Sequence, residues 1–197
     1  MKKSVKAKVF IAMLKLLKTK PLNEITVKEL VAEAGINRSS YHYHFYCLED
    51  VVDELLDYFF EGLGQTLMEK WENNSENPIS NLYPYLYEHR DFIETMNNAG
   101  YESAMASRTI ELLRNSYSNS VMTYVDENGR EVKMQNGTKF DFKANIAAYQ
   151  GYAIIKTWYD LDYPVAPENM SEYAIGLVNL RIKRIERKDI RKSAVLR

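Results

Sequence analysis

The stretch that decides the fold is residues 26–45, TVKELVAEAGINRSSYHYHF, which contains two helix signals separated by a glycine. Thr26 and Glu29 have the spacing of a capping box, in which each side chain binds a backbone amide of the other residue. The apolar positions that follow have helical spacing and end before Gly35, which predicts a helix of two turns. Asn37 is a good N-cap for a second short helix. This spacing predicts a helix-turn-helix.

The second of these helices is unusually polar. Only Tyr41 and Phe45, four residues apart, have the size and spacing of core anchors. The other side chains are hydrogen-bond donors or acceptors, namely Arg38, Ser39, Ser40, His42, Tyr43 and His44. A helix that exposes almost all of its polar groups is poorly suited to a core. It is well suited to contacting base edges and phosphates from a major groove.

The sequence on both sides predicts further helices. Apolar residues recur every three to four positions in 5–17, with an end near Lys20, and again in 49–71. The polar segment 72–78 is the best candidate for a boundary. Helical patterns return in 79–98, 101–120, 140–161 and 168–190, with break points at Pro84 and His89–Asp91. Residues 121–138 change period and predict either a small hairpin or a mobile loop. The predicted fold class is all-α.

Length and composition place the chain among ordinary globular proteins. It has 197 residues, of which 46% are hydrophobic and 27% charged. Cys47 is the single cysteine of the sequence, which excludes an intramolecular disulfide and a cysteine-rich zinc site. Apolar runs stay far below the roughly 20 residues of a membrane helix. Residues 1–20 lack the cleavage signal of a leader. We therefore expect a cytoplasmic protein that does not enter a membrane.

Charge is distributed unevenly along the chain. The formal net charge is +4 over residues 1–50, −11 over 51–180 and +6 over 181–197. A basic N-terminal segment joined to an acidic body is expected when one part of a protein docks on a polyanion. Solvated helix faces are the alternative reading. The basic tail 181–197 is either a second DNA contact or the solvated end of a helix.

Motifs for catalysis are missing from the sequence. It contains no phosphate-binding loop, dinucleotide-binding fingerprint, zinc-protease motif or nucleophile elbow. His42, His44 and Cys47 lack a further ligand at helical spacing that would complete a tetrahedral metal site. We therefore expect no enzyme activity, no cofactor and no metal.

The N-terminal part of the chain resembles the TetR family of bacterial transcription regulators, of the TetR/AcrR type. The resemblance covers residues 4–60 and rests on the stretches LNEITVKEL (22–30), AGINRSS (34–40), YHF (43–45) and EDV (49–51). The remainder is similar in a looser way. The resemblance implies a helix-turn-helix DNA-binding domain over residues 1–47, followed by a helical ligand-binding and dimerisation domain over 48–197.

The resemblance also implies which residues contact DNA: Thr26, Lys28, Asn37, Arg38, Ser39, Ser40, His42, Tyr43 and His44. Among them Arg38 is the first choice for a bidentate guanine contact. Thr26 and Lys28 would hold phosphate at a helix N-terminus. Two positions depart from the family pattern, with His42 where tyrosine is common and Leu48 where lysine is common. The missing lysine removes one phosphate contact per subunit.

For the C-terminal part, the resemblance implies a small-molecule cavity with aromatic walls. The candidate ligand-binding residues are Tyr87, Tyr101, Tyr152 and Trp158, each of which could instead belong to the core. The last two helices, 140–161 and 168–190, carry long apolar stripes. These stripes predict that the two helices pair with those of a second copy in a four-helix bundle.

Two functions remain open on these grounds. The first is a ligand-responsive repressor that acts as a homodimer on a palindromic operator in double-stranded DNA, with half-sites one helical turn apart. The alternative is a TetR-like adaptor or coactivator that works through protein partners and binds DNA weakly. Leu48 and His42 are the residues that favour the alternative.

Overall fold

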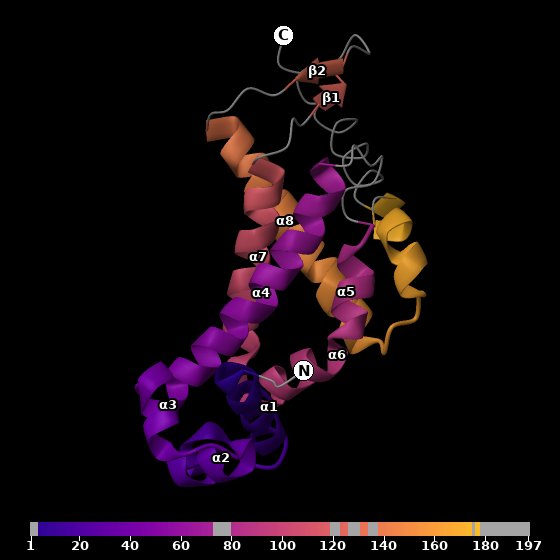
Figure 1. The fold of residues 1–197 in the computed structure, drawn as a ribbon. Helices are drawn as coiled ribbons and strands as arrows, with labels where there is room; N and C mark the ends of the chain where they lie inside the picture. The colour runs from indigo at the N-terminus through magenta and orange to yellow at the C-terminus, as the bar shows by residue number, and fades with distance from the viewer. Residues whose placement is uncertain are drawn as a thin grey trace. The chain divides into compact units, whose positions relative to one another are not determined.

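The computed structural model describes residues 4–72, 80–118, 123–125, 131–133, 138–174 and 176–177, and nearly all of them are helical (Figure 1). The predicted all-α class is confirmed. In chain order the elements are α1 (Val5–Leu17), η1 (Leu22–Glu24), α2 (Val27–Ala34), α3 (Arg38–His44), α4 (Leu48–Glu72), α5 (Leu82–Glu88), α6 (Arg90–Met96), η2 (Asn97–Tyr101), α7 (Glu102–Ser118), β1 (Thr123–Val125), β2 (Glu131–Lys133) and α8 (Thr138–Asp160). Residues 167–174 and 176–177 are also helical.

The chain divides into two compact units. The first comprises Met1–Thr66 and Tyr85–Thr109, and the second comprises Leu67–Pro84 and Ile110–Arg197. The first unit therefore joins α1, α2 and α3 with most of α4, with α6 and with η2. The sequence predicts a boundary after residue 47 between a DNA-binding domain and a ligand-binding and dimerisation domain. This functional boundary stays a prediction.

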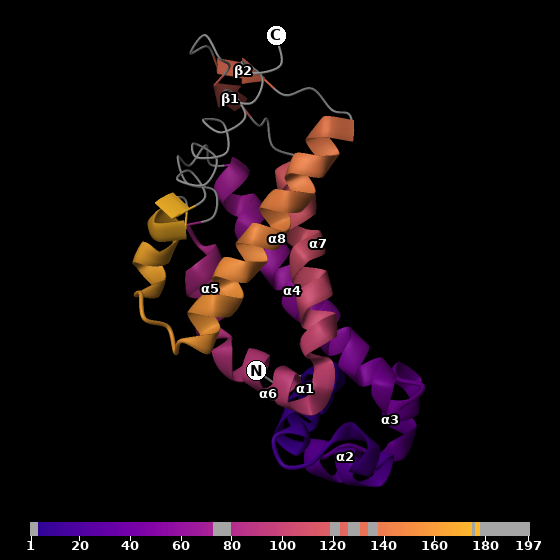
Figure 2. The same cartoon turned by 180° about the vertical axis from the view of Figure 1, so that it is seen from behind.

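The first unit is built around the apolar face of α1. Ser4 caps this helix by accepting a hydrogen bond from the backbone amide of Ala7 at 3.2 Å. The helix ends at Leu17, earlier than predicted, because the amides of Thr19 and Lys20 both turn back to the carbonyl of Leu16. Its buried side chains pack with those of α2, α3 and α4 in one core, which includes Val9, Met13, Leu30, Tyr41, Phe45, Val51, Val52, Leu55 and Leu56. In Figures 1 and 2, α1, α2 and α3 gather at one end of α4.

An aromatic cluster connects α4 with α6 inside the first unit. The ring of Phe59 stacks on that of Phe92 with centroids 4.7 Å apart, and Tyr85 stacks on His89 at 4.1 Å. The hydroxyl of Tyr85 donates to the carbonyl of Phe59 at 3.0 Å. A Cβ atom at Gly62 would lie only 2.5 Å from this hydroxyl oxygen. The close approach therefore requires a glycine at this position.

The segment 79–98, for which helical patterns with two break points were predicted, contains α5 and α6. Helical geometry is interrupted at His89, which has φ −97° and ψ 15°. The predicted break point at His89–Asp91 is therefore confirmed. Pro84 was the other, and that prediction is wrong. This residue lies in the first turn of α5, where the missing amide of a proline costs no intrahelical hydrogen bond.

The second unit contains a cluster around Trp158 of α8. Its indole Nε1 donates to the carbonyl of Val165 at 2.8 Å, and its ring meets Tyr83 and Tyr163 edge to face. The predicted last helix begins close to its expected start, and its residues 178–190 lie outside the described residues.

Of the two readings of 121–138, the hairpin is the one the structure contains. β1 and β2 pair antiparallel, with Tyr124 opposite Val132. Residues 126–130, which connect the two strands and include the Asn128–Gly129 pair expected at a hairpin turn, lie outside the described residues.

Candidate nucleic-acid interface

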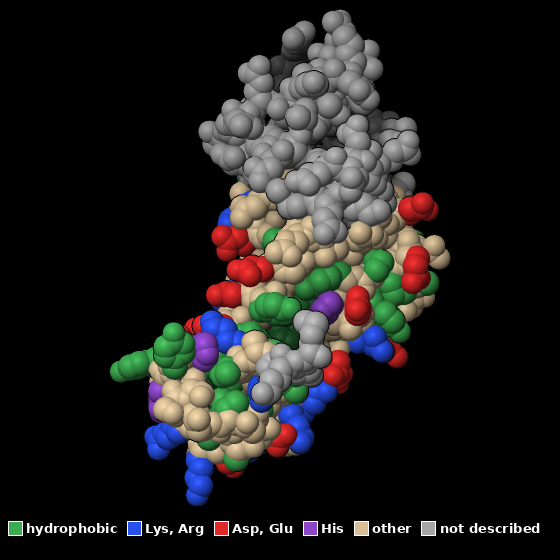
Figure 3. All heavy atoms as spheres, in the orientation of Figure 1, with side chains coloured by type: hydrophobic (Ala, Val, Ile, Leu, Met, Phe, Trp, Pro, Cys, Tyr) green, Lys and Arg blue, Asp and Glu red, His purple; other side chains and the backbone are tan. Residues whose placement is uncertain are grey.

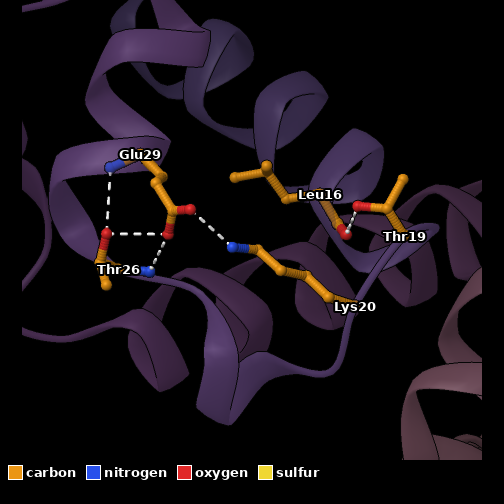
Figure 4. A network of polar contacts seen from close by, with 5 residues as sticks. All are labelled: Leu16, Thr19, Lys20, Thr26 and Glu29. Atoms are coloured by element: carbon orange, nitrogen blue, oxygen red, sulfur yellow. Dashed lines mark hydrogen bonds and ion pairs between the residues drawn. The ribbon is translucent and has the colours of Figure 1, made fainter.

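The start of α2 is fixed by a closed network of polar contacts (Figure 4). The hydroxyl of Thr26 accepts a hydrogen bond from the Glu29 amide at 3.2 Å. In return, the Thr26 amide and hydroxyl each donate to Glu29 Oε2 at 2.9 Å. Lys20 adds an ion pair to Glu29 Oε1 at 2.6 Å. The Lys20 ammonium and the Thr26 donors together lower the pKa of Glu29 from 4.5 to about 2.

This network determines which donor groups at the N-terminus of α2 remain available to bind an anion. The hydrogen of the Thr26 hydroxyl is directed to a carboxylate, and the amides of Thr26 and Glu29 are both satisfied. The amides of Val27 and Lys28 have no partner among the described residues. The Lys28 side chain is exposed beside them. An anion at this end would therefore meet two amides and one ammonium group, and Thr26 would contribute mainly by holding the turn.

The turn between α2 and α3 depends on Gly35. This residue has φ 60° and ψ 44°, the left-handed conformation that closes many helices. The amide of Ile36 returns to the carbonyl of Val31 at 3.1 Å, and that of Gly35 to Ala32 at 3.2 Å. A Cβ atom at Gly35 would meet nothing within 4 Å. The backbone conformation, rather than lack of space, is what requires a glycine.

The first turn of α3 is ordered by Asn37. Its Oδ1 accepts hydrogen bonds from the Ser40 amide at 2.7 Å and from the Ser39 hydroxyl at 2.8 Å. One turn further, Arg38 Nε donates to His42 Nε2 at 3.3 Å. The guanidinium of Arg38 is therefore oriented by a neighbour on its own helix.

Two side chains anchor α3, and a separate set faces outward. Tyr41 is fully buried and Phe45 is 2% exposed. Burial raises the pKa of Tyr41 to about 12. Arg38, Ser39, His42 and Tyr43 are exposed, while Ser40 and His44 are partly buried. Thr26, Lys28 and Asn37 are also exposed. The structure thus exposes seven of the nine predicted DNA-contact residues and half-buries two.

The cations of the helical head differ in their partners. Four lysines form ion pairs with carboxylates of the same unit, namely Lys6 with Glu54, Lys15 with Glu33, Lys18 with Asp91 and Lys20 with Glu29. Lys28 of α2 and Arg38 of α3 have no carboxylate partner among the described residues. In Figure 3, Lys and Arg side chains and histidines gather over α1–α3. Two cations near the helix-turn-helix are therefore available to a polyanion.

Tyr46, the second residue after α3, was not among the predicted contact residues. Its side chain is 91% exposed, and Tyr43 is 84% exposed. No helical pattern could reveal this, because Phe45 already has an extended backbone, with φ −136° and ψ 137°. The sequence contains one indication of this exposed ring, because a second large aromatic residue, Tyr46, directly follows the core anchor Phe45.

The predicted ligand-binding residues are divided between the two units. Tyr87 and Tyr101 are partly buried in the first unit, and Tyr152 and Trp158 belong to the second. Trp158 lines an open cavity of about 400 Å³ in the second unit, and Tyr152 is not among its walls. The other lining residues are Gln150, Ala153, Ile154, Thr157, Leu161, Pro164, Val165, Met170, Tyr173 and Leu177. These predicted roles stay predictions.

The described residues contain neither a cluster of potential metal ligands nor a helix suited to a bilayer. No cluster of three or more His, Cys, Asp or Glu side chains in this part of the chain could hold a metal ion. None of its helices combines the length and apolar character needed to cross a bilayer.

Comparison with known proteins adds relatives of one kind. The fold is similar to that of a TetR/AcrR transcriptional regulator from Aquifex aeolicus, with a TM-score of 0.54 and 14% identity over 90% of this chain and 99% of that one. NalD of Pseudomonas aeruginosa, the secondary repressor of the MexAB-OprM multidrug efflux pump, gives a TM-score of 0.51 and 16% identity over 87% and 93% of the two chains.

In sequence, the chain is 23% identical over 186 residues to YxbF of Bacillus subtilis, an uncharacterised HTH-type transcriptional regulator. The match covers 91% of this chain and 46% of YxbF, so the chain spans about half the length of this relative. No family model matches the sequence. All three relatives are described as transcriptional regulators or repressors.

Proposed function

On the premise that this chain has the fold of the TetR/AcrR regulators, we propose that it binds double-stranded DNA and regulates transcription. The observation that carries the proposal is the outer face of α3. Arg38, Ser39, His42 and Tyr43 are exposed there, while Tyr41 and Phe45 hold the helix to the core. A helix anchored on one side and polar on the other fits the major groove, which is about 12 Å wide.

Each element of the head has its own role in this proposal. α3 enters the major groove, and Arg38 binds the O6 and N7 atoms of a guanine. Lys28 and the two open amides at the start of α2 bind a phosphate. Asn37 retains its amide donors for DNA, because only its carbonyl oxygen is used within the helix cap. Ser40 and His44 contribute less than predicted, because they are partly buried.

The homodimer is part of the proposal. α8 carries an exposed apolar stripe at helical spacing, with Phe142 68%, Ile146 45% and Tyr149 59% exposed. The helical segment that follows exposes Tyr173 and Leu177. Large apolar side chains that recur on one face favour a protein interface over a solvated surface. A symmetric pair of chains would cover both stripes and bring two copies of α3 to a palindromic operator.

The cavity beside Trp158 supports an effector of modest size. Its volume of about 400 Å³ falls within the range of small-molecule sites. Its walls are largely aliphatic and aromatic, with polar groups from Gln150, Thr157 and Tyr173. An apolar molecule with one or two polar groups would bind there. If it prefers one spacing of the two heads, it would shift operator affinity. We propose repression as the output, as for NalD.

The adaptor alternative rests on His42 and Leu48, the two departures from the family pattern. Leu48, the first residue of α4, provides no cation where the resembling family commonly has lysine. The structure favours DNA binding over this alternative, because Lys28 and Arg38 remain exposed without carboxylate partners among the described residues.

The test is selection of duplexes from a randomised DNA pool by the full chain, followed by fluorescence-anisotropy titration of the enriched duplex and of random DNA. We expect a palindromic site bound at least about 1,000-fold more tightly than random DNA at physiological salt. Arg38→Ala should remove this preference, and Lys156→Ala on α8 is the matched loss of one cation elsewhere. Equal affinity for enriched and random DNA would support the adaptor.

A further inference from the structure

One aromatic ring is exposed in the last turn of α3 and another in the connector, residues 45–47, that joins α3 to α4. Tyr46 at 91% and Tyr43 at 84% have the highest exposures among the large hydrophobic side chains of the described residues. They lie within four residues of each other, and we call these two side chains the aromatic rim. In Figure 3, hydrophobic side chains protrude beside the histidines over α3. Scattered apolar residues on a surface need no explanation, but two such rings at one end of a recognition helix do.

The exposure of the rim is not a result of loose packing. Tyr41 and Phe45, which alternate with these rings in sequence, are both buried. The backbone amide of Tyr46 donates to Asp50 Oδ2 at 2.9 Å, which ties the connector to the first turn of α4. The side chain of Tyr46 makes no ring contact or hydrogen bond with the described residues. Tyr46 is therefore held at its backbone and free at its ring.

The charges around the rim limit what it can bind. Leu48 adds no cation, and Glu49 and Asp50 follow in the first turn of α4. An ionic contact with a phosphate is therefore not available from the connector itself. A tyrosine offers an uncharged hydroxyl donor and a flat apolar ring. Both groups can contact a DNA backbone, the hydroxyl through a phosphate oxygen and the ring through a deoxyribose.

We propose that Tyr46 is a further DNA-contacting residue of this chain, and that its connector contacts the sugar-phosphate backbone through uncharged groups. This inference rests on the proposed DNA binding. Tyr43 is exposed on the same helix as Arg38, Ser39 and His42, and the exposed Tyr46 lies two residues beyond its end, so we infer that a duplex bound along α3 meets both rings. Lys28 and Arg38 are exposed and have no carboxylate partner among the described residues. These two cations favour a polyanion over a protein as the partner of this surface.

The proposal has a signature that separates it from an ionic contact. Each phosphate neutralised by a cation adds about 0.9 to the slope of log affinity against log salt, because it releases counterions. A tyrosine contact releases none. Losing Tyr46 should therefore weaken binding equally at all salt concentrations, while losing Lys28 should weaken binding and flatten the slope.

The experiment titrates the full chain with the fluorescent duplex that the wild-type protein enriched from the random pool, at several salt concentrations between about 50 and 200 mM. We expect Tyr46→Ala to bind roughly three- to tenfold more weakly with an unchanged slope, as for the loss of one hydrogen bond and its packing. Tyr46→Phe should lose only the hydroxyl contribution. Tyr58→Ala, which removes a 70% exposed tyrosine of α4, should bind as the wild type does.

A gain-of-charge variant tests the location of the connector independently. Leu48→Lys should bind more tightly and steepen the salt slope by about one, if the connector faces the backbone. Circular dichroism melts confirm that each variant is folded.

The outcomes are distinct. Wild-type affinity in Tyr46→Ala, or an unchanged slope in Leu48→Lys, would overturn this inference while leaving the proposed function intact. Failure of the wild-type chain to enrich any duplex would overturn both. Loss of a protein complex in Tyr46→Ala, with DNA affinity retained, would identify the rim as a protein-docking surface instead.

Discussion

Thr26 and Glu29 show how much one pair of residues can fix at the start of a helix. Their mutual hydrogen bonds satisfy two amides, and Lys20 holds the carboxylate from the preceding turn (Figure 4). This pair was predictable, because the capping box is a local pattern of two residue types at fixed spacing. The partner Lys20 was not, because the pattern says nothing about which cation lies nearby.

Replacing Thr26 should cost stability without changing the fold. We expect Thr26→Ala to lower the free energy of unfolding by about 1 kcal/mol, because the Glu29 amide loses its acceptor. Urea denaturation followed by circular dichroism measures this. Thr26→Ser keeps the hydroxyl and should stay close to the wild type, and an equal loss in both variants would contradict the capping role.

The lowered pKa of Glu29 predicts a dependence of stability on pH. The pKa falls from 4.5 in the unfolded chain to about 2 in the fold, so the ionised carboxylate stabilises the native state above pH 4.5. This contribution is lost as the pH falls toward 2. We expect the stability difference between wild type and Glu29→Gln to shrink over that range, since glutamine keeps the cap but not the charge. A difference that does not vary with pH would argue against an electrostatic origin.

Gly62 is a position where the ordinary effect of alanine should reverse. Within a helix, Gly→Ala commonly stabilises by about 0.5–1 kcal/mol. Here the new Cβ would lie 2.5 Å from the Tyr85 hydroxyl oxygen. We expect Gly62→Ala to destabilise the protein by about 1 kcal/mol through overpacking.

A double-mutant cycle decides whether the clash is the cause. Tyr85→Phe removes the hydroxyl, and the next atom of the ring would then be 3.4 Å from the Cβ atom. In that background, Gly62→Ala should stabilise the protein. Destabilisation of equal size in both backgrounds would place the cause elsewhere.

At the scale of elements, the helices were predictable where their signals are local. The stops and starts of α2 and α3 follow from Thr26, Gly35 and Asn37, and the structure places all three as expected. The end of α1 was misjudged by three residues, and Pro84 was misread as a break, because turn geometry and position within a turn decide both cases. A periodic pattern locates helices better than it locates their ends.

The exposed stripe of α8 carries the prediction that belongs to this scale. If Phe142, Ile146 and Tyr149 form the dimer interface, Ile146→Asp should shift the chain to monomers, because a carboxylate would be buried without a partner. Analytical ultracentrifugation over a range of concentrations measures the shift. Lys143→Asp, on the same helix, changes the charge outside the stripe and serves as the control. A wild-type chain that is monomeric throughout would refute the interface.

For the molecule as a whole, the sequence predicted a two-part chain but not where its compact units divide. The first unit includes α6, which begins at Arg90, far downstream of the end of α3 at His44. The Lys18–Asp91 ion pair spans 73 residues, and Phe59 reaches Phe92 through stacking. Contacts of this kind leave no periodic trace in a single sequence. The same holds for the cavity, whose walls include Trp158 but not Tyr152.

These contacts predict that α6 unfolds together with the head. In native-state hydrogen exchange, the amides of 90–96 should open with the same free energy as those of α1. Thr26→Ala should lower the protection of both elements to the same extent. Protection of α6 that is unaffected by this change would show that the first unit is not one cooperative body.

The hydrogen bond from Arg38 to His42 should affect the rate at which the protein dissociates from DNA. An arginine side chain normally loses about 2 kcal/mol of rotational entropy when it is immobilised. Here the Nε atom is already tethered, and the two terminal nitrogens form a prearranged fork. Binding to a guanine should therefore cost less side-chain entropy at Arg38. The residence time on that guanine should be longer than for an arginine without this hydrogen bond.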